Sequence, residues 1–216
     1  MSLKSFEISW VDLLAAAVVV VGVLRGRSRG MSEEVLDLIK WLSILILAAN
    51  TYQPVAHFLA ESTVFSLLSC YIAVYAAVII VVQSIFAILK GGLGRKLVGS
   101  DVFGGAEYYL GMAAGAIRYA CVFLVGMAFV HARHFTAEEI AKDNKYQQEN
   151  YGSIRFPSWY GLQQSTFELS WVGRMTVKHL DSVLIESTFP EAKGFAGAEN
   201  MVKGRERAFN EVLEKK

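Results

Sequence analysis

The chain has 216 residues, of which 54% are hydrophobic and 19% charged, and its formal net charge is +1. This composition lies at the apolar edge for a soluble protein, and the positive mean hydropathy indicates a bilayer protein. The near-zero net charge argues against nucleic acid as a partner. Because charge is concentrated in the last third, we expect an all-α transmembrane domain over residues 1–131 and an exoplasmic tail over 132–216.

Four hydrophobic segments meet or approach the roughly 20 apolar residues that a helix needs to cross a bilayer. They are residues 8–24, 38–59, 64–89 and 108–130, and together they predict a four-helix transmembrane bundle with an α-helical tail. The first segment carries Asp12 beside Trp10, which suits an interfacial anchor. Basic residues follow this segment instead of preceding it, so we interpret it as a retained span and not as a signal peptide.

The connections between these segments differ in charge, and this predicts an orientation. Basic residues gather in the first and third connections, as Arg25, Arg27 and Arg29, and as Lys90, Arg95 and Lys96. The second connection carries Glu61 and no basic residue. Since short loops rich in Lys and Arg stay cytoplasmic, we place the first and third connections there, against lipid headgroups. Both termini and the tail are then periplasmic, in a multi-pass protein of a bacterial inner membrane.

Two further regions connect or follow the spans. The glycine-rich segment 91–105 lacks the motif of a phosphate-binding loop, so we expect a flexible or interfacial connection. Thr136 and Glu139 form a capping-box pattern that predicts a short polar helix ending near residue 150. From 158 to about 187, apolar residues at helical spacing, with Trp159 and Trp171, predict one amphipathic helix, either at the membrane surface or packed on the bundle.

Arg118 lies deep in the fourth segment, where an unpaired charge costs at least about 2.5 kcal/mol. It therefore requires partners. Gln83 of the third segment and Asp37 or Glu34 of the second are the candidates for an intramembrane polar cluster. We favour an ion pair that fixes the register of the helices, and the alternative is part of a substrate path.

Gly111 and Gly115 in the fourth segment have the spacing that lets two helices approach closely. Internal packing against the first or third segment is favoured, and self-association into a homo-oligomer is the alternative. Asp12, close to the outer boundary, is interpreted as a helix cap or surface group, with a proton or cation role as the alternative.

No catalytic residue, cofactor or metal site is expected. Cys70 and Cys121 lie in apolar segments without a histidine to activate them, so we interpret them as packing residues. His131, His134 and Glu138 share one helical face, but a structural zinc site needs a fourth ligand.

Two stretches of the chain form a recognisable pattern. The first is Trp10-Val-Asp12, an apolar span and the basic run from Leu24 to Gly30, and the second holds Glu107, Leu110, Gly111, Gly115 and Arg118. With the looser Pro157-Ser-Trp-Tyr segment, this pattern resembles the bacterial colicin V production protein family over residues 8–185. It departs from that family at Glu107-Tyr108, where the family prefers Asp-Arg, and at Tyr119, where a glycine is usual.

The resemblance implies a four-span inner-membrane protein linked to export of a peptide toxin in the founding case and to envelope homeostasis more widely, with no established enzymatic reaction. In some relatives the same spans anchor a periplasmic serine protease, but the tail of this chain is too small for a protease, and residues 132–216 contain no Gly-x-Ser-x-Gly motif. We therefore expect a non-enzymatic accessory or scaffold protein. Its partners would be the bilayer and other membrane or envelope proteins, bound through the fourth span and the aromatic tail. The alternative is a small transporter or channel component organised around Arg118.

Overall fold

The structure is a computed structural model that describes residues 9–63, 65–98, 104–152 and 158–189, without the side chains of 92–98. All regular elements in these ranges are helical. The α-helices are α1 (Trp10–Arg29), α2 (Met31–Ser62), α3 (Leu67–Val98), α4 (Glu107–His131), α5 (Ala137–Tyr151), α6 (Trp159–Gln164) and α7 (Trp171–His179). Short 3-10 turns are η1 (Gly104–Ala106) and η3 (Asp181–Val183), and η2 (Ser165–Leu169) is a π-helical turn. The expected all-α fold class is confirmed for the described residues.

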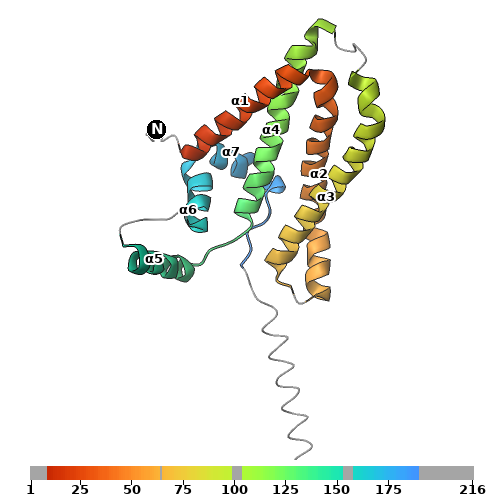
Figure 1. Cartoon of the computed structure of the whole chain (residues 1–216). Coiled ribbons are helices and arrows are strands. Elements are labelled where there is room, and N and C mark those ends of the chain that lie inside the picture. The colour runs from red at the N-terminus through yellow and green to blue at the C-terminus, as the bar shows by residue number, and fades with distance from the viewer. Residues whose placement is uncertain (1–8, 64, 99–103, 153–157, 190–216) are drawn as a thin grey trace, which may run out of the picture.

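The four long helices form one bundle, in which α1 packs along α4 and α2 lies between α4 and α3 (Figure 1). Its core holds large, fully buried side chains such as Ile44, Tyr71 and Tyr75. Leu184 and Ile185 belong to the same core, and the Tyr52 hydroxyl donates to the Leu184 carbonyl oxygen at 3.3 Å. The segment after α5 therefore closes one end of the bundle instead of extending away from it.

Three of the described helices are long and apolar enough to cross a membrane: Met31–Ser62, Leu67–Gly91 and Gly104–His131. The first helix, α1, is not among them, because its 20 residues include Asp12 and three arginines. The count of four spans is therefore supported for three helices, and a crossing by α1 stays a prediction. α2 also begins at Met31, seven residues before the expected start of the second span.

The connection expected from residue 91 onward is helical over its first half, since α3 continues to Val98. The physical reason is that glycine costs only about 1 kcal/mol relative to alanine in a helix, so a few glycines do not end one that is otherwise supported. Arg95 and Lys96 lie in this last part of α3.

The single amphipathic helix expected over residues 158–187 is wrong. The chain instead forms α6, the turn η2, α7 and the turn η3. Ser158 and Ser170 explain the breaks, because each serine hydroxyl accepts from a backbone N–H three residues later and so begins a new helix. Gly173 packs directly against the backbone of Thr166, where no side chain fits. The segment therefore folds back on itself.

The polar helix expected after Thr136 is confirmed as α5. Thr136 Oγ1 accepts from the Glu139 backbone N–H at 3.2 Å, and the Glu139 carboxylate accepts from the Thr136 N–H at 3.3 Å. No residue of α5 is buried, and in Figure 1 the helix lies apart from the long helices.

Candidate functional site: a buried charge cluster and a glycine seam

Two carboxylates on the first turns of α2 meet the buried arginine of α4. Glu34 and Asp37 share one helical face because residues three apart on a helix are neighbours. The Nη1 atom of Arg118 lies 2.6 Å from Glu34 Oε2 and 3.3 Å from Asp37 Oδ2. Glu34 is completely buried, and Arg118 is 7% exposed. The residue that sequence reasoning identified as needing a partner therefore has two.

Cations from the other long helices complete this group. Arg29 of α1 lies 3.5 Å from Glu34 and 3.6 Å from Asp37, while Lys40 of α2 and Lys90 of α3 each lie 3.1 Å from Asp37. We call the six residues the charge cluster: Arg29, Glu34, Asp37, Lys40, Lys90 and Arg118. With four cations and two carboxylates it carries a formal charge of +2, and it joins all four long helices.

The pairing explains how Arg118 is tolerated inside the bundle. The residue lies eleven positions after Glu107, or about 16 Å along α4. The Glu34 oxygens face their cations without an aligned hydrogen bond, so the attraction between them is Coulombic. The Arg118 guanidinium also stacks over the Tyr119 ring, 4.7 Å from its centroid. Removing Arg118 would leave the fully buried Glu34 with Arg29 alone, at a cost approaching that of an uncompensated buried charge, about 3–5 kcal/mol.

Of the predicted partners, the structure brings Asp37 and Glu34 to Arg118 but not Gln83. Gln83 is exposed on α3, about two turns or 10 Å before Lys90. The third helix contributes Lys90 instead, because a long lysine side chain can reach Asp37 from a half-exposed position. Sequence spacing could have indicated Lys40, which lies three residues after Asp37, whereas nothing local to α3 pointed to Lys90.

A glycine seam joins α1 to α4. Gly111 and Gly115 of α4 lie against Gly26 and Gly22 of α1, backbone to backbone. A Cβ atom added to Gly111 would lie 2.5 Å from the Gly26 carbonyl oxygen, and one added to Gly22 would lie 2.7 Å from that of Gly115. Packing against the first helix, one of the favoured alternatives, is what the structure shows. This face of α4 is covered by α1, so within the bundle it is not available for self-association, which was the alternative.

The turn between α1 and α2 is tied to α4 by a contact that sequence reasoning missed. Gly30 has φ of 75°, a conformation that favours glycine, and it supplies no side chain to cap α2. Glu107 provides the cap from α4, since its Oε1 accepts from the Ser32 backbone N–H at 3.1 Å. The negative charge of the Glu107 carboxylate also interacts favourably with the positive end of the α2 helix dipole.

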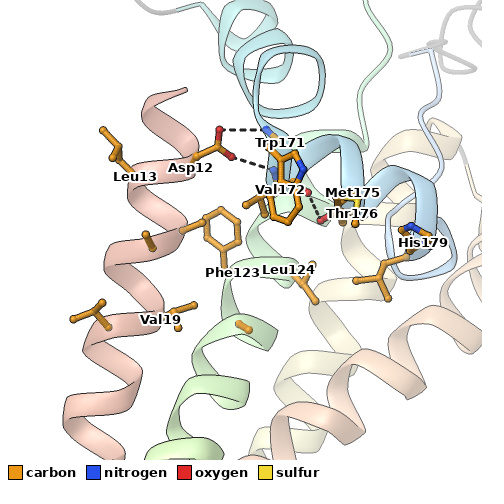
Figure 2. A pocket seen from close by; sticks show the side chains of 15 residues that line it. Asp12, Leu13, Val19, Phe123, Leu124, Trp171, Val172, Met175, Thr176 and His179 are labelled. Carbon is orange, nitrogen blue, oxygen red and sulfur yellow. Dashed lines mark hydrogen bonds between the residues drawn. The ribbon is translucent and has the colours of Figure 1, made fainter. Parts of the chain in front are cut away.

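Asp12, expected to be a cap or surface group, caps two helices at the opposite end of the bundle. Its carboxylate accepts from the Ser9 N–H at 3.1 Å, which completes a capping box on α1. It also accepts from Ser170 Oγ at 2.6 Å. Figure 2 shows two more of its hydrogen bonds, from Trp171 N at 3.2 Å and from Val172 N at 3.0 Å. The second set holds the first turn of α7 against α1. The sequence around Asp12 indicates only its cap on α1, because α7 lies more than 150 residues away in the chain.

Of the basic residues expected at lipid headgroups, some are exposed and one is paired inside the bundle. Arg25 and Arg27 are exposed at the end of α1, whereas Arg29 turns into the charge cluster. The side chains of Arg95 and Lys96 lie outside the described residues. Cys70 and Cys121 are buried, free cysteines, as their interpretation as packing residues predicts.

A family model described as colicin V production protein matches residues 11–149, well over half of the chain. The chain belongs to the colicin V production protein family. The match covers α1 to α4 and most of α5, so the family region contains the charge cluster and the glycine seam, while α6 and α7 lie beyond it. No curated protein and no solved structure matches the chain. Family membership and three helices of spanning length together support a membrane protein.

Proposed function

We propose that this colicin V production family member is a non-enzymatic accessory or scaffold protein of the bacterial inner membrane, supporting toxin export or envelope homeostasis. The observation that carries the proposal is the charge cluster, in which two carboxylates on α2 bind cations from every long helix. Arg118 is occupied by Glu34 and Asp37, as expected of a group that fixes helix register. A solute path organised around Arg118 would need that side chain to exchange partners.

Arg118→Met separates the scaffold from the transporter alternative, with the exposed Arg27→Met as the matched control. A scaffold should lose the envelope proteins that co-purify with the native chain in mild detergent, because the helices lose their register. A transporter should keep those partners and lose flux of its solute in vesicles. If Arg118→Met keeps its partners, its fold and its fluxes, the proposed role of the cluster is wrong.

We further propose that α1 is a fourth crossing, with the cluster at the cytoplasmic side and both termini in the periplasm. At 20 residues, α1 is about 30 Å long, which matches the hydrocarbon core. Between Leu13 and Leu24 its exposed side chains are all apolar, with Val20 among them. Asp12 and the arginines lie near its two ends, where long basic side chains can reach the headgroups.

Thiol labelling tests this orientation. Asn144 on α5 is exposed, so the variant Asn144→Cys should react with an impermeant maleimide in intact spheroplasts. The variant Ser28→Cys, at the end of α1, should react only after lysis. The native Cys70 and Cys121 are buried and give a low background. The reverse labelling pattern would overturn the proposed topology.

The partner surface is proposed to lie on the C-terminal segment, which runs from α5 to η3, since the glycine face of α4 is covered. This segment exposes aromatic side chains, with Trp159 67% and Tyr146 58% exposed, and aromatic residues are enriched at protein interfaces. Trp159→Ser should reduce the yield of co-purified envelope proteins, whereas Lys142→Ser on the same segment should not. Equal yields from both variants would place the partner surface elsewhere.

A further inference from the structure

A groove of about 950 Å³ lies between α1, α4 and α7, close to the bundle end that holds Asp12 (Figure 2). Its size is that of a small-molecule site, for which roughly 300–1,000 Å³ is typical. Apolar side chains form its walls from all three helices, including Ala16 and Val19, Ala120 and Phe123, and Trp171 and Met175. The groove is therefore built for a hydrocarbon group.

The roof of the groove is α7, and this helix has two different faces. Trp171, Met175 and His179 recur four residues apart and line the groove. Arg174 and Lys178 are exposed beside this row, and neither forms an ion pair with any residue that the structure describes. A helix with an aromatic and apolar face next to a basic face suits the membrane interface.

The one carboxylate among the residues that line the groove already has hydrogen-bond partners. Asp12 lines the groove, but it accepts hydrogen bonds from Ser9, Ser170, Trp171 and Val172. It thereby holds α7 in place over the groove and forms no ion pair with Arg174 or Lys178. Arg174 donates one hydrogen bond, to the Glu168 carbonyl oxygen at 3.5 Å, which leaves its charge without a counter-ion among the described residues. An anionic group beside α7 would meet complementary charge.

We propose that the groove binds one acyl chain of an anionic phospholipid, with the headgroup phosphate against Arg174, Lys178 and His179 of α7. This inference rests on the membrane placement proposed above. The groove follows α1 from Asp12 to Val20, about 12 Å along the helix axis, so it takes the headgroup-proximal part of a chain. Charge complementarity selects a lipid over an uncharged partner helix, because Arg174 and Lys178 are exposed on α7, the same helix that supplies one apolar wall of the groove.

Matched variants on α1 test the site. The chain is purified from membranes in mild detergent, and bound lipid is measured by native mass spectrometry and by lipid extraction. The native protein should retain about one phospholipid per chain, enriched in anionic headgroups over the source membrane. Ala16→Trp fills the groove and should lower retention several-fold, whereas Ala17→Trp, at an exposed neighbour that does not line the groove, should not. Val19→Trp provides a second blocking variant if Ala16→Trp fails to fold.

Charge variants test the headgroup. Arg174→Ala with Lys178→Ala should keep the bound lipid but reduce its anionic enrichment several-fold. Equal retention by Ala16→Trp and Ala17→Trp, a native protein with no anionic enrichment, or a co-purified protein displaced by Ala16→Trp would each overturn the proposal. Extraction of the native chain from membranes by carbonate would instead refute the membrane placement, so the two failures are distinguishable.

Discussion

Replacing Gly111 by alanine adds one methyl group at the closest approach of α1 and α4. The new carbon would lie 2.5 Å from the Gly26 carbonyl oxygen and 2.8 Å from both the Cα and the carbonyl carbon of Gly30. Ordinary van der Waals contact begins at 3.4 Å, so the two helices must separate by 0.6–0.9 Å. All three neighbouring atoms belong to the backbone, and no side chain can rotate to relieve the contact.

The expected effect on stability follows from two opposing terms. Overpacking of this kind costs about 1–3 kcal/mol. Separating the helices also moves the turn at Gly30 away from Glu107, whose carboxylate caps α2 at the Ser32 N–H. Alanine regains about 1 kcal/mol of helix propensity over glycine. We therefore expect Gly111→Ala to destabilise the bundle by up to about 2 kcal/mol.

Gly126→Ala on the same helix is the matched control, because an added Cβ atom at Gly126 meets no atom within 4 Å. This variant should be as stable as the native chain or slightly more stable. The measurement is the unfolding midpoint of the three proteins in one detergent, followed by tryptophan fluorescence. If Gly111→Ala unfolds at the same midpoint as Gly126→Ala, α1 does not pack on α4 in the way described.

Other contacts make independent predictions. Glu34→Gln should lower the unfolding midpoint because it removes the nearer carboxylate from Arg118. The cost should stay below that of an uncompensated buried charge, about 3–5 kcal/mol, because Asp37 still pairs with Arg118; an unchanged midpoint would contradict the ion pair. Gln83→Leu should have no effect in the same assay, since Gln83 is exposed and apart from the cluster. Asp12→Ala removes the cap of α7, typically worth about 1 kcal/mol, so hydrogen exchange should increase in α7 and remain unchanged in α3. Thr136→Ala should reduce protection from exchange in α5 alone, because its capping box is local.

Local features of this chain were readable because their physical causes are local. The capping box at Thr136 involves residues three apart, and it predicted the start of α5. The close spacing of Gly111 and Gly115 predicted a face for helix packing, and the apolar setting of Arg118 required a partner. Periodicity alone misjudged residues 158–187, because the serine caps at Ser158 and Ser170 outweighed the apolar repeat.

The sequence by itself determined a helical membrane chain and an arginine in an apolar segment that needed a counter-charge, and three of the four spans that it predicted are helices of spanning length. Only the tertiary structure decided that Glu34 and Asp37 supply that charge, that Lys90 joins them instead of Gln83, and that Asp12 holds α7. Hydrophobic periodicity and the capping boxes at Ser9 and Thr136 act between near neighbours in the chain. The choice of distant partners depends on how each helix is rotated and where the C-terminal segment docks, and these are set only when the whole bundle packs.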